Sequence, residues 1–317
     1  MCGIAGFLAK SNDVDVAGGL TAMLDALRGR GPDSTGVSLY GAPHPGNALA
    51  SVWCGEATSA DPLDEVLAAI RAHGEVLAAD ERSGYLRVGL QLPDLEPGTL
   101  GQVADTVEAA APGVRVFSIG RSLELVKHTS AAPALAETFG LLGKPYTHAI
   151  GHARMATESI VDVNHSHPFW ARPFADVTVV HNGHVTNYHK NRRLYEMRGH
   201  RFQTGNDTEF VAVYLADKLA HGVSLDDAVR ASIDELDGSF TYLVSTAEGF
   251  GVARDRFSTK PCLIAETDSW VAVVSEGIAL AEAFGDDVDF KVTELAGGEA
   301  RAWAHGRSSG EPERVAA

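Results

Sequence analysis

The sequence is poor in cysteine, with three residues in a chain of 317. Three cysteines cannot build the disulfide framework that stabilises small secreted proteins, so we expect a protein of the reducing cytoplasm. No apolar run approaches the roughly 20 residues that span a bilayer. The first residues also lack the charged and apolar regions of a signal peptide. We therefore expect no membrane contact and a cytoplasmic location.

Positive charge is also scarce, because 26 Lys and Arg stand against 42 Asp and Glu and give a formal net charge of −16. Such an excess of negative charge disfavours nucleic acids and anionic membranes as partners. The basic residues cluster only at Lys190, Arg192 and Arg193, a group that we interpret as the solvated face of a helix. The HExxH and Cys-His spacings typical of zinc sites are missing, so we predict no metal.

The remaining composition, 45% hydrophobic and 21% charged, is that of an ordinary globular protein. Short apolar runs joined by turns favour antiparallel sheets, and the helical patterns between them predict helices that cover those sheets. Strands are expected at 4–8, 37–40, 48–53, 85–92, 114–119, 123–126, 147–153, 177–181, 240–245, 250–254, 262–266 and 270–275, and helices around 20–27, 63–70, 100–107, 133–139, 211–219 and 225–236.

The segment 60–146 has its own alternation of helices and strands and contains no cluster of acids, bases or nucleophiles. We predict that it forms a small α+β subdomain inserted into a main domain over 1–305. The polar residues 306–317 are predicted to form a disordered tail.

Cys2 is the strongest candidate for a catalytic group. Removal of the initiator methionine would give it a thiol and a free α-amino group. In reference peptides such an amine titrates near about 8 and a thiol near about 8.5, so the amine can accept the thiol proton near neutral pH. The alternatives are a lipidated cysteine, which would need a signal peptide, and a structural one. Cys54 and Cys262 show no metal-like spacing and are interpreted as structural.

Four further segments complete a pattern. They are Arg-Gly-Pro-Asp at 30–33, Gly-His-Ala-Arg-Met-Ala-Thr at 151–157, His-Asn-Gly-His at 181–184 and Gly-Asn-Asp-Thr-Glu at 205–209. Together with Cys2 they resemble the glutaminase domain of class II glutamine amidotransferases, which are N-terminal-nucleophile hydrolases. The resemblance covers roughly 1–40 and 147–276. It implies an α+β fold, a four-layer α/β/β/α sandwich of two antiparallel sheets.

The resemblance also implies residues that bind glutamine. A guanidinium suits the α-carboxylate and a carboxylate suits the α-ammonium, roles that fall to Arg154 and Asp207. Arg30, Thr157 and His167 are carried over as further substrate-binding residues. A surface ion pair remains the alternative for Arg154, and capping of a helix remains the alternative for Asp207.

Attack of a thiolate on an amide creates an oxyanion that needs preorganised donors. The resemblance implies that Asn182, with its side-chain amide, and Gly183, with its backbone N–H, supply them beside the nucleophile Cys2. A plain Asn-Gly turn is the alternative interpretation.

Met155 and Glu158 stand where many family members have Trp and His. This variant resembles stand-alone amidotransferase subunits of the glutamate-synthase type, including those of N-methylglutamate synthase. It implies hydrolysis of L-glutamine to glutamate and ammonia, with ammonia passed to a separate flavin-dependent synthase subunit in a hetero-oligomer. No dinucleotide fingerprint or P-loop is present, so no cofactor is expected in this chain. A stand-alone γ-glutamyl amide hydrolase and a non-catalytic regulatory subunit remain alternatives.

Overall fold

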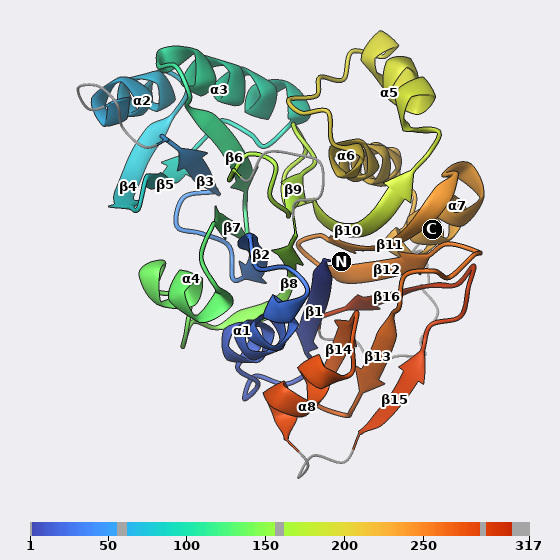
Figure 1. Ribbon diagram of the computed structural model, residues 1–317. Helices are drawn as coiled ribbons and strands as arrows, with labels where there is room; N and C mark the ends of the chain where they lie inside the picture. The colour runs from blue at the N-terminus through green and yellow to red at the C-terminus, as the bar shows by residue number, and fades with distance from the viewer. Residues whose placement is uncertain (1, 56–61, 156–161, 286–289, 306–317) are drawn as a thin grey trace, which may run out of the picture.

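The computed structural model describes residues 2–55, 62–155, 162–285 and 290–305. Its main body consists of two antiparallel sheets stacked face to face, with helices on both outer sides (Figure 1). This arrangement confirms the predicted α+β sandwich with four layers. The central strands are buried at nearly every position, so each sheet has two apolar faces that other layers must cover.

The first sheet has seven strands and holds both β1 and the strand that ends at Arg154. Their order across the sheet is β15 (Lys291–Glu294), β13 (Leu263–Glu266), β14 (Trp270–Val274), β1 (Gly3–Ala9), β8 (Tyr146–Arg154), β2 (Ser34–Gly41) and β7 (Leu123–His128).

The second sheet has five strands and carries the Asn-Gly motif on β10. Their order is β16 (Ala300–Ala304), β12 (Gly249–Arg254), β11 (Gly238–Ser245), β10 (Thr178–Val185) and β9 (Phe169–Trp170).

The two sheets share an apolar core. Ile4 and Leu8 of β1 point into it, together with Val180 of β10 and Leu243 of β11. The intervening Phe7 packs on the opposite face, in the cluster that includes the outer helices. Each central strand therefore has two buried faces, which explains why its sequence is apolar almost throughout.

Helices close the sandwich on both sides. The seven-stranded sheet is covered by α1 (Val16–Ala26), α4 (Ala132–Thr138) and α8 (Ile278–Phe284), with a short 3₁₀ turn, η1 (Leu27–Gly29), after α1. The five-stranded sheet is covered by α6 (Asp207–Ala220) and α7 (Leu225–Glu235), and α5 (Tyr188–Met197) packs on α6 (Figure 1). Asn206 caps α6 by accepting the N–H of Thr208 at 2.9 Å, so Asp207 is free of the capping role considered for it.

A third sheet of four strands lies beside the sandwich under α2 (Pro62–Arg71) and α3 (Pro97–Ala110) (Figure 1). Its order is β4 (Glu75–Arg82), β5 (Tyr85–Gln91), β3 (Ala48–Trp53) and β6 (Arg115–Gly120). β3 precedes residue 60, and β7 already belongs to the seven-stranded sheet. The bounds 60–146 stay a prediction, and the tail 306–317 lies outside the described residues.

Tyr40 links the two main sheets. It lies on β2 and is fully buried, and its hydroxyl is 2.9 Å from Thr178 Oγ1 of β10. The same hydroxyl donates to the carbonyl oxygen of Ser245, at the end of β11, at 3.2 Å. A buried hydroxyl with partners from the facing sheet fixes how the sheets lie against each other.

We predict that Tyr40→Phe lowers the free energy of unfolding by about 1–2 kcal/mol, because it removes a buried hydroxyl that bonds Thr178 and Ser245 of the facing sheet. Urea titration would measure this loss. Tyr214→Phe is a matched control, since the Tyr214 hydroxyl donates to Glu235, whose side chain is 48% exposed and can turn to water. Equal losses in the two variants would contradict the assigned role of Tyr40.

Candidate active site

Cys2 lies directly before β1, at the start of the central strand of the seven-stranded sheet. The pairing of Gly3 with Ala153 places it beside the end of β8. The N–H of Met155 points at the Cys2 sulfur over 3.4 Å, and the carbonyl oxygen of Met155 is 3.6 Å from the same sulfur. The thiol is half-buried, so it has a defined neighbour and remains open to solvent on one side.

Asn182 reaches Cys2 from the other sheet. Its side-chain amide donates to the carbonyl oxygen of Cys2 at 3.0 Å. Its Oδ1 atom is buried and has no hydrogen-bond partner among the described residues. The contact joins β10 to the start of β1, and it places a polar amide next to the candidate nucleophile.

Gly183 adopts a backbone conformation that excludes other residues. Its φ is +131°, a value rarely adopted by L side chains. A Cβ atom at this position would lie 2.0 Å from the carbonyl oxygen of Ser239 on β11. Glycine is therefore required here by the close approach of the two strands.

The N–H of Gly183 points to the same side of β10 as Asp207. Backbone groups two residues apart along a strand face the same side. On that side, the N–H of His181 donates to His167 Nδ1 at 3.3 Å, and the N–H of Val185 donates to Asp207 Oδ2 at 2.8 Å. The N–H of Gly183 therefore also faces away from β11. Only an N–H that is not used in the β10–β11 ladder can bind an oxyanion.

Asp207 begins α6 and carries a fixed negative charge. Burial raises its pKa, but the neighbouring imidazole of His181, the N–H of Val185 and the imidazole of His184 outweigh burial and lower the pKa to about 2. Its Oδ1 is 3.5 Å from His181 Nδ1, and its Oδ2 is 3.7 Å from His184 Nδ1. The carboxylate is therefore ionised at neutral pH and suited to a cationic ligand.

Arg154 ends β8 and is buried, with 5% of its surface exposed. This burial argues against the alternative of a surface ion pair. The segment 30–33 packs along it, because the N–H of Asp33 donates to the Arg154 carbonyl at 3.0 Å. A Cβ atom at Gly31 would lie 2.1 Å from the carbonyl oxygen of Ala153, so the close approach of this segment to β8 requires glycine.

The Arg30 side chain reaches the side of β1 that faces β14, away from β8. Its guanidinium forms an ion pair with Glu276, which follows β14. The adjacent Ser275 exchanges hydrogen bonds with Ile4, so this pair lies next to the start of β1. Sequence patterns gave no indication of Glu276 as the partner.

His167 is buried under the site rather than open to solvent. Its ring stacks on that of His152 with centroids 4.1 Å apart, and burial lowers its pKa well below the usual range. It thereby joins β8 to β10 through His181. The predicted contact of His167 with substrate stays a prediction. Thr157 lies outside the described residues, and so does its predicted role.

Lys127 is a buried lysine of β7. The sequence did not predict its burial, because a lysine in a strand is usually assigned to the solvent-exposed face. Its ammonium group donates to the carbonyl oxygen of Ser166 at 2.9 Å and lies 4.1 Å from the ring centre of Phe117. Burial lowers its pKa to about 7. It helps hold the loop that leads to His167.

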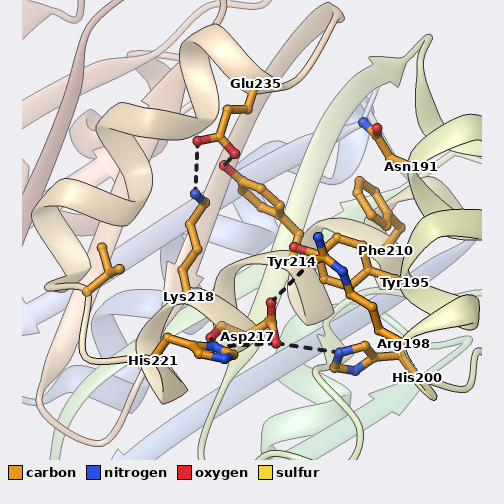
Figure 2. Close-up of a pocket in the computed structure, with 11 residues that line it drawn as sticks. Asn191, Tyr195, Arg198, His200, Phe210, Tyr214, Asp217, Lys218, His221 and Glu235 are labelled. Atoms are coloured by element: carbon orange, nitrogen blue, oxygen red, sulfur yellow. Dashed lines mark hydrogen bonds and ion pairs between the residues drawn. The ribbon is translucent and has the colours of Figure 1, made fainter.

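Cavities are also present away from these residues. One of about 730 Å³ lies among α5, α6 and α7 (Figure 2), and Cys2, Arg154 and Asn182 do not line it. Within the described ranges, no three His, Cys, Asp or Glu side chains form a group that could hold a metal. Nor does any helix in this part of the chain combine the length and apolarity needed to cross a membrane.

Known proteins resemble this chain in sequence and in fold. A family model for a glutamine amidotransferase domain matches residues 152–282. The chain is 36% identical to a putative glutamine amidotransferase of Methanothermobacter thermautotrophicus, over 96% of this chain and 99% of that protein. It is also 36% identical to the glutamine amidotransferase-like protein GlxB of Rhizobium meliloti, over 88% of this chain and 91% of GlxB.

A solved structure has a similar fold. The B. subtilis glutamine phosphoribosylpyrophosphate amidotransferase superposes with a TM-score of 0.58 at 17% identity. The match covers 95% of this chain and 47% of that chain, so this protein spans about half the length of the larger enzyme.

We predict that acid destabilises the protein through two neutral histidines of β8. Burial lowers the pKa of His152 to about 3 and that of His148 to about 4. Below the reference pKa of about 6.5 the unfolded chain binds protons that the folded chain does not, so stability falls as the pH drops from 6.5 towards 4. Each histidine contributes up to about 1.4 kcal/mol per pH unit.

Urea unfolding at several pH values between 7.5 and 4.5 would measure this slope. His148→Gln should reduce it by about one proton, because glutamine can still donate to the carbonyl oxygen of Thr246, the present partner of His148 at 2.8 Å. His221→Gln, at a side chain that is 74% exposed, should leave the slope unchanged. A slope equal to wild type in His148→Gln would contradict the prediction.

Proposed function

The chain belongs to the class II glutamine amidotransferases and is an enzyme of this class, and we propose that it hydrolyses L-glutamine through a γ-glutamyl thioester on Cys2. The observation that carries this proposal is the convergence at Cys2. The start of β1, the end of β8 and the Asn-Gly motif of β10 meet there, linked by the hydrogen bond from Asn182 to the Cys2 carbonyl.

The proposed reaction has two stages. The α-amino group of Cys2, freed by removal of Met1, takes the thiol proton, and the sulfur attacks the amide carbon of glutamine. Asn182 and Gly183 stabilise the oxyanion, and the C–N bond then breaks as the amine returns the proton to the leaving ammonia. Water attacks the thioester and releases glutamate. The thiol, the amine and water supply all of the chemistry, so we propose no cofactor in this chain.

Glutamine is held by charge complementarity in this proposal. Arg154 binds the α-carboxylate through the two parallel N–H groups of its guanidinium. Asp207 binds the α-ammonium, a role supported by its low pKa and by its bond from the N–H of Val185, on the side of β10 that the Gly183 N–H faces. Arg30, Thr157 and His167 complete the predicted substrate-binding set.

The ammonia acceptor is proposed to be a separate flavin-dependent synthase subunit in a hetero-oligomer, as in glutamate synthases. The flavin-dependent synthase in this proposal rests on the resemblance to glutamate-synthase-type subunits, and the proportions of the matches support only the separateness of the acceptor. The two relatives at 36% identity align over 99% and 91% of their length and are named only for glutamine amidotransfer. The larger phosphoribosylpyrophosphate enzyme aligns over 47% of its chain.

A test of the partner compares glutamate release by the purified chain alone and with candidate synthase subunits. We predict low activity alone and a rise of roughly 5- to 150-fold on assembly, the usual range of coupling between two sites. Maximal turnover by the isolated chain, unchanged by every partner tried, would instead favour a stand-alone γ-glutamyl amide hydrolase.

The N-terminus offers a direct test of the chemistry. One extra residue before Cys2 removes the α-amine while leaving the thiol in place, so glutaminase activity should fall by at least about 100-fold, the contribution typical of a general base. Intact mass would confirm the processing state of each preparation. Full activity in the extended protein would rule out the amine as base.

A second variant separates binding from chemistry. Arg154→Lys keeps the charge and loses the guanidinium fork, so we predict a KM for glutamine raised by about 10-fold or more at a kcat within a few-fold of wild type. Arg230→Lys, in an exposed ion pair of α7, is the matched control. An unchanged KM with a reduced kcat would show that Arg154 acts on the transition state alone.

A further inference from the structure

The segment 199–206 leads into Asp207 and has no secondary structure of its own. Backbone bonds tie Gly199 and His200 to the end of α5, and side chains hold the rest of the segment. On the inner side, Glu209 accepts the N–H groups of Gln203 and Thr204 at 2.7 and 2.8 Å. The carboxylate of Glu209 is buried, so these bonds are shielded from water.

The start of the segment is held from α6 as well. His200 lies 3.5 Å from the carboxylate of Asp217, and Arg198 lies 4.0 Å from it. Figure 2 shows both side chains turned toward Asp217. The inner face of the segment thus rests on the helix that Asp207 begins.

The outer side of the segment is held by α3, in the layer beside the sandwich. Arg201 is 3.0 Å from Asp105 Oδ2, and the side-chain amide of Gln203 donates to Glu108 Oε1. Asp105 and Glu108 are three residues apart and therefore share one face of the helix. Arg201 is 79% exposed, so its pair alone would hold the segment weakly.

Arg172 makes these two carboxylates into a rigid unit. Its guanidinium is buried, at 2.6 Å from Asp105 Oδ1 and 2.8 Å from Glu108 Oε2. Each carboxylate thus uses one oxygen for Arg172 and presents the other to the segment. A buried guanidinium is tolerated only when such partners are in place, which keeps the geometry fixed.

We propose that Asp105, Glu108 and Arg172 are positioning residues that fix the segment 199–206 and thereby Asp207 for glutamine binding. The inserted layer then serves substrate affinity, although it contains no candidate for the chemistry. The inference rests on the proposed role of Asp207 in binding the ammonium group. Because the unit acts through the segment, its loss raises KM and leaves the chemical step at Cys2 intact.

The test uses Asp105→Asn, which removes one charge from the unit at a side chain that is 51% exposed and so tolerates change. Asp226→Asn, which breaks the exposed pair with Arg230 on α7, is the matched control. Two readouts are taken on the full chain: KM and kcat for glutamine, and hydrogen exchange at the amides of Gln203 and Thr204.

We expect Asp105→Asn to raise KM between about 3- and 30-fold at a kcat within two-fold of wild type, and to speed exchange at both amides. The control should change neither KM nor the exchange rates. Asp105→Glu keeps the charge, so its KM should lie between those of wild type and Asp105→Asn. Unchanged exchange at both amides, or an unchanged KM, would overturn the proposal. If the wild-type chain hydrolyses no glutamine, the proposed function fails, and the exchange rates still decide whether the unit positions the segment.

Discussion

The pairing of β1 with β8 is the constraint on which the site depends. Because Gly3 faces Ala153, the residue before β1 must lie beside the residues that end β8. The sandwich brings β10 over the same end of these two strands, where Asn182 donates to the Cys2 carbonyl. Without the shared core of the two sheets, the thiol and the Asn-Gly motif would have no fixed relation.

Burial and hydrogen bonding then determine which groups near Cys2 are charged. His152 of β8 remains neutral because burial disfavours its charged form. Asp207 remains ionised because backbone and imidazole donors outweigh its burial. The ionised carboxylate of Asp207 and the buried guanidinium of Arg154 carry opposite charges. That distribution suits an amino-acid ligand, which carries both charges itself.

The sequence predicted the sandwich well where burial dictates the pattern. The two-faced apolar strands β1 and β11 stand out for this reason. Strands β4 and β15 escaped prediction because they are exposed edge strands without apolar alternation, and β9 has only two residues. Motifs identified the residues near Cys2, but partners such as Glu276 of Arg30 depend on sheet order, which spacing along the chain does not encode.

The most direct measurement is the covalent state of Cys2 during turnover. The protein is mixed with glutamine, quenched in acid within milliseconds to seconds, and digested, and the N-terminal peptide is weighed by mass spectrometry. We expect one γ-glutamyl group on the peptide that begins at Cys2, appearing and decaying as glutamate forms. Glutamate produced with Cys2 unmodified throughout, or a γ-glutamyl group on Cys54 or Cys262 instead, would contradict it.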